Sequence, residues 1–98
     1  MRDDEVLAAI LVEEADLTLD SVAAACTVER EWLLRHVEEG LFPRAEVVAG
    51  GWRLPGSSLP RARRIWQIER DFDATPELAA LVADLLEELD ALRARQAG

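Results

Sequence analysis

His36 and Cys26, the one histidine and the one cysteine of this 98-residue sequence, are the residues that could form a nucleophile and its base. Both fall on the inward sides of predicted helices, where a buried thiol is inert and a histidine is expected to be a hydrogen-bonded core residue. A zinc site would need three carboxylates around the single imidazole, an improbable set of ligands. We therefore predict no catalytic residue, no metal site, no cofactor and no enzymatic activity.

Charge is the next chemical signal. The chain holds 20 acidic and 11 basic residues, for a net charge of −9. Residues 19–40 carry two Arg and five acids, whereas residues 41–70 carry six Arg and two Glu; the segments 1–18 and 71–98 are each strongly acidic. A DNA-reading protein should concentrate positive charge on its recognition helix and the neighbouring wing together. This distribution disfavours a nucleic acid and favours a basic protein partner.

The elements that would position these charges begin with two short helices. Thr18 is a plausible N-cap for a helix that reaches Cys26, and a second helix follows from about Glu29 until Gly40 supplies a left-handed stop. Two short helices separated by about three residues predict a helix-turn-helix over residues 18–41. Two β-prone runs around Gly50-Gly51 then predict a hairpin, the wing, over residues 42–56.

Two further helices are predicted in residues 57–98. One runs from about Ser58 to Phe72, and the other begins at Pro76, behind Thr75 as N-cap, and extends to about Gln96. Large aliphatic residues form one stripe on this last helix: Leu78, Leu81, Val82, Leu85, Leu86, Leu89 and Leu92. Two interpretations stay open: the stripe packs only on the third helix and the helix-turn-helix, or part of it exceeds that core and pairs with a second copy. The expected fold is a single, mainly α domain.

Residues 1–17 form an N-terminal segment whose apolar run, Val6 to Val12, is compatible with a helix or a strand and slightly favours a strand. This run is the longest in the chain and is too short to span a membrane. The acidic N-terminus is the reverse of the basic start of a signal peptide. A lone cysteine needs no oxidising compartment, so we expect a soluble, cytoplasmic protein.

The stretch from Thr27-Val28-Glu29 to Glu39-Gly40-Leu41 resembles, without a gap, the helix-turn-helix of MerR-type regulators, and Gly51-Trp52-Arg53 is similar to the end of their wing. The resemblance implies a MerR-like winged helix-turn-helix. It covers the apolar and glycine positions that determine the fold. The sequence differs from the pattern of that family at positions where the family contacts DNA. The residues found at these positions are Glu31, Leu34, Arg35 and His36.

Several short motifs, in order along the chain, are similar to the chaperone modulator CbpM family. They are Leu17-Thr18-Leu19, Arg61-x-Arg63-Arg64, Arg70-Asp71 and the leucine and glutamate pattern from Leu85 to Leu92. The resemblance implies a protein that binds the J-domain of a CbpA-like co-chaperone and restrains its cooperation with Hsp70. It also implies a homodimer, because proteins of the MerR fold pair through their C-terminal helices.

J-domains present a basic helix, so an acidic surface is the expected binding site. Two acidic sets are candidates, Asp84, Glu87 and Glu88 on the last helix or Glu29, Glu31 and Glu38 on the second, and the sequence does not choose between them. For the acids of the last helix, a solvated helix face is the simpler interpretation.

The alternative function is transcription regulation, with DNA contacted by Arg30, Arg35, Arg44 and Arg53. The cluster Arg61, Arg63, Arg64 and Arg70 is expected to pair with acids of the last helix or of the N-terminal segment rather than with phosphate. Trp32, Trp52 and Trp66 are expected to be core or half-core residues.

Overall fold

The computed structural model describes residues 16–97, and the prediction for Val6 to Val12 lies outside them. Its elements are β1 (Asp16–Thr18), α2 (Leu19–Cys26), α3 (Arg30–Glu38), β2 (Glu46–Val48), β3 (Gly51–Pro55), α4 (Ser58–Phe72) and α5 (Pro76–Ala97). The predicted winged helix-turn-helix with two C-terminal helices is confirmed.

Local capping explains where the first two helices begin and end. The Thr18 hydroxyl accepts from the Ser21 N–H, and the Ser21 hydroxyl accepts from the Thr18 N–H, so two free donors at the start of α2 are satisfied. Thr27 ends α2 in the left-handed conformation, with φ of 58°. Gly40 follows α3 at φ of 79°, a conformation that glycine adopts without steric cost.

The wing belongs to a three-stranded antiparallel sheet in the order β1-β3-β2. Gly50 and Gly51 turn the predicted hairpin with φ of 95° and 128°. The third strand, β1, in which Leu17 pairs with Leu54, was not predicted. This pairing fixes the wing directly against the start of α2.

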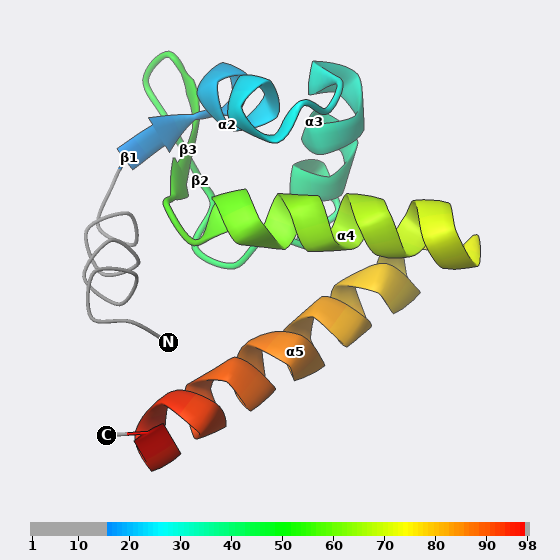
Figure 1. The fold of residues 1–98 in the computed structure, drawn as a ribbon. Coiled ribbons are helices and arrows are strands. Elements are labelled where there is room, and N and C mark those ends of the chain that lie inside the picture. Colours follow the sequence, from blue (N-terminus) through cyan, green and yellow to red (C-terminus); the bar gives the residue numbers. More distant parts are fainter. Residues whose placement is uncertain (1–15, 98) are drawn as a thin grey trace.

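The core lies between α2, α3 and α4, where Val22, Leu33 and Ile65 are fully buried. α5 packs mainly on α4 (Figure 1), and it does so through its alanines Ala79 and Ala83. Thr75 caps α5, as predicted, by accepting from the Leu78 N–H at 3.2 Å. Among residues 16–97, no helix is long and apolar enough to cross a membrane.

The leucine stripe of α5 does not join this core. Its leucines are exposed, by between 36% for Leu86 and 57% for Leu85, and Val82 is half-buried. The small side chain of alanine lets the backbones of α4 and α5 approach closely, so the alanine face is buried and the leucines are left on the outer surface.

Candidate protein-interaction surface

The outward face of α3, the second helix of the helix-turn-helix, carries Glu31, Arg35 and Glu38, which recur at helical spacing and are exposed. The opposite face buries Leu33 and Val37 against the core. The face presented to a partner therefore has two carboxylates and one guanidinium. We call Glu29, which is exposed at the N-cap of α3, together with Glu31 and Glu38, the α3 acidic face.

The residues of the α3 acidic face make no ion pair with the part of the chain between residues 16 and 97. Arg35 lies between Glu31 and Glu38 and also has no ion pair among the described residues. The carboxylates of this face are thus open to a cationic partner.

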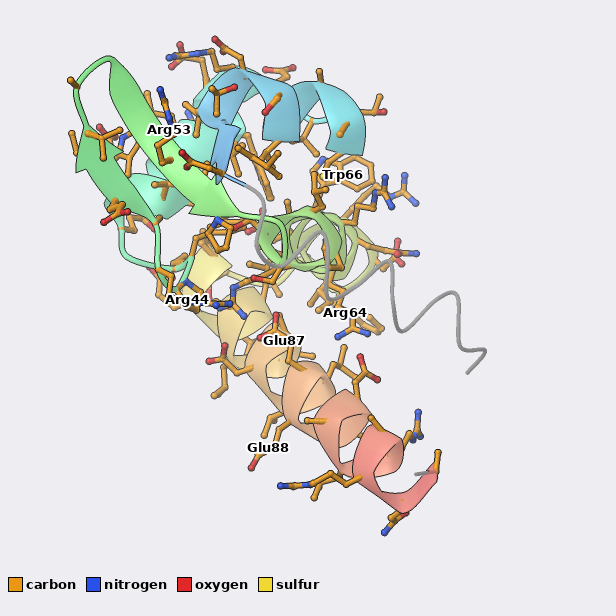
Figure 2. The ribbon with its side chains drawn as sticks, turned by 90° about the vertical axis from the view of Figure 1, so that its left-hand side faces the viewer. Arg44, Arg53, Arg64, Trp66, Glu87 and Glu88 are labelled. Carbon is orange, nitrogen blue, oxygen red and sulfur yellow. The ribbon has the colours of Figure 1, made fainter. Side chains whose placement is uncertain are left out.

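The other arginines proposed for DNA contact are engaged within the protein. Arg30 Nε lies 2.6 Å from Asp20 Oδ1, and Arg53 Nε lies 3.9 Å from Asp16 Oδ2. Arg44 donates to the Ser57 hydroxyl at 3.0 Å. In Figure 2, Arg53 lies beside the strands of the hairpin, whereas Arg44 lies below them. These contacts reduce the cationic surface that a DNA phosphate would meet.

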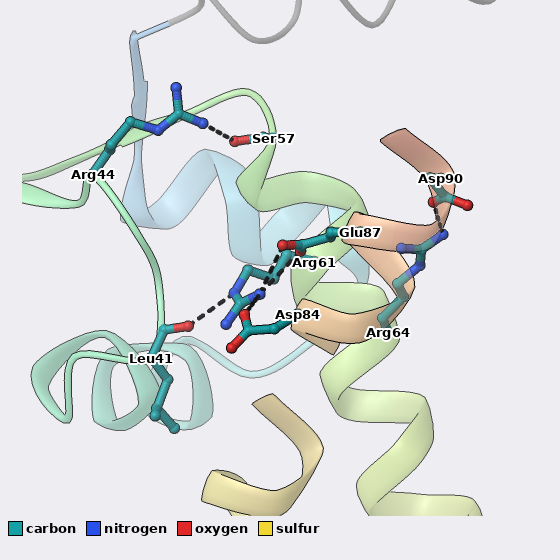
Figure 3. Close-up of polar contacts among 8 residues, drawn as sticks. All are labelled: Leu41, Arg44, Ser57, Arg61, Arg64, Asp84, Glu87 and Asp90. Carbon is teal, nitrogen blue, oxygen red and sulfur yellow. Dashed lines mark hydrogen bonds and ion pairs between the residues drawn. The ribbon is translucent and has the colours of Figure 1, made fainter. Parts of the chain in front are cut away.

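Arg61, in the first turns of α4, forms ion pairs with two acids of the last helix, α5 (Figure 3). It is 5% exposed, and its Nη1 lies 2.8 Å from Asp84 Oδ1 and 3.0 Å from Glu87 Oε2. Its Nε donates to the Leu41 carbonyl at 2.9 Å, so one side chain joins α4, α5 and the end of the helix-turn-helix.

Two of the three candidate acids of α5 belong to this Arg61 cluster. Asp84 and Glu87 were candidates for partner binding, and each already holds Arg61. Glu88 is exposed and directed away from α4, whereas Glu87 points toward it (Figure 2). The structure therefore does not bring the three predicted α5 acids together into one open surface.

Two of the four basic residues of α4 confirm the predicted pairing with acids of the last helix. These are Arg61 and Arg64, the second of which lies 2.6 Å from Asp90. Arg63 instead donates to the Ala25 carbonyl, and Arg70 lies over the Trp66 ring. Trp32, Trp52 and Trp66 are all half-buried, as expected.

A buried polar network lies between α3 and α4. His36 is 4% exposed, and its Nδ1–H donates to the Trp32 carbonyl at 2.7 Å, since a carbonyl oxygen can only accept. Its Nε2 lies 2.5 Å from one oxygen of Glu69, and Trp32 Nε1 donates to the other at 3.0 Å. His36 is thus a satisfied core histidine, as predicted.

Cys26 lies at the end of α2, half-buried rather than enclosed in the core. Burial raises the pKa of its thiol, although nearby Arg63 acts in the opposite direction. The thiol hydrogen-bonds the Leu59 carbonyl at 3.3 Å. A raised pKa keeps the sulfur protonated at neutral pH, which is unfavourable for a nucleophile. Among residues 16–97, no group of three or more His, Cys, Asp or Glu residues could hold a metal ion.

The network around His36 and the cluster around Arg61 could be predicted only in part from the sequence. The inward position of His36 follows from helical spacing, but its partner Glu69 lies 33 residues further on. An available signal was the position of Glu69 beside apolar residues of the predicted third helix. Arg61 was expected to pair with an acid, but its burial was not foreseen.

The geometry described above defines a winged helix-turn-helix protein with an acidic second helix. A sequence model of the family described as MerR HTH family regulatory protein matches residues 17–97. The chain belongs to this MerR helix-turn-helix family. No curated protein and no solved structure matches the chain.

Proposed function

We propose that this protein is a chaperone modulator of the CbpM type, a non-enzymatic protein that binds the J-domain of a CbpA-like co-chaperone and restrains its activity. The observation that carries the proposal is the α3 acidic face. It occupies the helix that a DNA-binding relative would place in the major groove. Carboxylates there repel phosphates but attract the basic helix of a J-domain.

The α3 acidic face is favoured over the α5 acids as the binding site. Glu31 and Glu38 are open to solvent, whereas Asp84 and Glu87 already hold Arg61, which another cation would have to compete with. Releasing Arg61 would leave its charge in a largely buried position, at a cost in free energy. We therefore place the J-domain on α3 and the adjoining turn.

Charge reversal on α3 tests this placement. The double substitution Glu31→Lys and Glu38→Lys should weaken J-domain binding about tenfold at low salt, mainly by slowing association, because steering by opposite charges is lost. The Kd and the association rate can be measured by biolayer interferometry with a purified CbpA-like J-domain.

The matched control is Glu77→Lys with Glu88→Lys, which changes the net charge equally on exposed residues of α5. It should bind almost as the unmodified protein does. If the control lost binding and the α3 variant kept it, the site would lie on α5. No binding of the unmodified protein at tens of micromolar would contradict the proposed function.

DNA binding is the second candidate, because the fold is compatible with it and the exposed guanidinium of Arg35 has no ion pair among residues 16–97. A specific complex with genomic fragments that dissociates steeply with added salt, and that is lost in Arg35→Ala, would favour a transcription regulator. Absence of such a complex at low salt would leave the protein-binding function as the better account.

We also propose that the protein forms a homodimer through α5. Leu78, Leu85 and Leu92 are seven residues apart, and Val82 and Leu89 fall between them, so their alternating spacing of four and three is that of a coiled-coil seam. This seam lies opposite the alanine face that packs on α4. A second copy of α5 would bury the exposed leucines.

The dimer should dissociate when charge enters the seam. Leu85→Asp with Leu89→Asp should raise the dissociation constant about 100-fold or more, because each buried leucine contributes about 1.5–3 kcal/mol. Sedimentation equilibrium measures the effect. Val47→Asp is the control, since Val47 is 68% exposed on the wing. An unmodified protein that stayed monomeric at tens of micromolar would contradict the proposal.

A further inference from the structure

A groove of about 260 Å³ lies between the second half of α4 and the middle of α5. The residues that line it are Arg64, Gln67, Ile68, Asp71, Phe72 and Leu86. Its two charged residues already have partners, because Arg64 pairs with Asp90 and Asp71 with Arg70. Phe72, the last residue of α4, is nevertheless 76% exposed. The apolar floor of the groove is therefore open to a ligand at Phe72.

The groove adjoins the leucine seam of α5. Ala79, Leu86 and Arg93 are seven residues apart, so they form one stripe along a flank of the seam. Ala79 is buried where α5 packs on α4, and Leu86 lines the groove, so this flank of the seam faces α4. A second copy of α5 on the seam would therefore also lie beside the groove.

The two ends of α5 carry opposite charges that have no partner among residues 16–97. Asp73, just before the helix, and Glu77, in its first turn, are exposed and make no ion pair there. Arg93 and Arg95, in the last turns, are exposed and equally without an ion pair. The second half of α5 runs away from α4 (Figure 1), so its arginines are accessible to a second copy.

We propose that two copies of α5 pair in antiparallel orientation and that Arg93 of each copy docks in the groove of the other, over Phe72. The inference rests on the homodimer proposed above and adds its orientation and a second contact area. When Leu85 of one copy faces Leu89 of the other, Arg93 lies opposite Leu81 of the partner subunit. The two-fold axis of such a pair brings the same flank of both helices together, so Arg93 reaches the groove.

The chemistry of the groove fits an arginine side chain. Its aliphatic stem can cover Phe72 and Leu86, while the guanidinium stays in water beside the Phe72 ring and near Glu77. Antiparallel pairing also sets the basic end of each helix against the acidic start of the other, which is electrostatically favourable. Because the dimer is symmetric, each of these contacts forms twice.

Parallel pairing is the competing arrangement. It would place Arg93 beside Glu88 of the partner subunit, since opposite flanks of the seam then meet. It would also set the two acidic starts of α5 side by side, where like charges repel. The antiparallel arrangement avoids this repulsion and covers Phe72 as well.

Disulfide cross-linking in a Cys26→Ser background tests the orientation. Val82→Cys and Leu92→Cys are prepared as separate full-length proteins with tags of different size, mixed to exchange subunits, and oxidised with copper phenanthroline. In the antiparallel dimer Val82 faces Leu92 of the partner subunit, so the mixed product should form at least about tenfold faster than either self-linked product. Self-linked products as the main outcome would mean parallel pairing and would overturn the proposal.

Sedimentation equilibrium tests the contact in the groove. Phe72→Ala and Arg93→Glu should each raise the dimer Kd about tenfold at low salt, and the effect of Arg93→Glu should shrink at about 0.5 M salt. The matched controls are Val47→Ala, at an exposed apolar residue of the wing, and Arg35→Glu, at an exposed arginine of α3. Both controls should leave the Kd unchanged. Phe72→Ala combined with Arg93→Ala should raise the Kd by less than the product of the single effects, because both remove one contact.

The outcomes separate this inference from the proposed dimer. An unmodified protein that stayed monomeric at tens of micromolar would overturn both. A dimer whose Kd changed with neither Phe72→Ala nor Arg93→Glu would overturn the groove contact alone. A monomer in which Phe72→Ala weakened J-domain binding would assign the groove to that partner and would overturn docking of a second copy.

Discussion

Arg61→Ala is expected to lower the free energy of unfolding by about 2–4 kcal/mol. The side chain is 5% exposed and bonds two carboxylates and one carbonyl. Its loss leaves the Leu41 carbonyl without this donor and opens a cavity beside Phe42. This loss of stability is smaller than that expected for a fully buried ion pair. Asp84 and Glu87 are 56% and 41% exposed, so water can solvate both carboxylates once Arg61 is removed.

Chemical denaturation followed by tryptophan fluorescence measures this change. Because Arg61 connects α5 to the rest of the protein, α5 should also lose protection from amide exchange. Arg64→Ala is the matched control: Arg64 and Asp90 are both accessible to solvent, at 32% and 48%, and their pair should contribute about 0–1 kcal/mol. If the two substitutions lowered the free energy of unfolding equally, the burial of Arg61 would not increase its contribution to stability.

Glu69→Leu is the second substitution with a large expected effect, also about 2–4 kcal/mol. Leucine fills a similar volume but accepts no hydrogen bond, so the Trp32 indole N–H and His36 Nε2 both lose their partner in a buried position. An unsatisfied buried polar group costs about 1–3 kcal/mol, more when it is charged. The free energy of unfolding and the near-ultraviolet circular dichroism of the tryptophans should both change.

Glu69→Gln separates hydrogen bonding from charge. The amide oxygen of glutamine can still accept from Trp32, so this variant should lose about half as much stability as Glu69→Leu. Glu88→Leu, on the exposed side of α5, should change stability by less than about 0.5 kcal/mol. A Glu69→Leu protein as stable as the Glu88→Leu protein would show that the buried network contributes little.

Much of the fold was predictable because the signals are local. Thr18 and Thr75 cap their helices through contacts three residues away, and Gly50 and Gly51 determine the hairpin turn by their own conformational freedom. β1 was missed because a three-residue strand has almost no signal of its own. Its partner, Leu54, lies 37 residues away in the sequence.

The candidate surfaces show the same difference between local signals and tertiary contacts. The acidic nature of the second helix was evident from residue types, because helical spacing places Glu31 and Glu38 on its outward face. The sequence could not choose between that surface and the acids of α5, since the partners of Asp84 and Glu87 are set by the packing of α5 on α4.

By itself, then, the sequence determined that the second helix is acidic, that the region around the wing is basic, and where each helix begins and ends. Helical spacing and capping are properties of neighbouring residues, so they can be read along the chain. Only the tertiary structure decided that the basic residue Arg61 is buried against the acids of α5, and that α5 packs by its alanines and exposes its leucines. Those outcomes depend on which helix faces approach each other in space, and sequence spacing does not specify that.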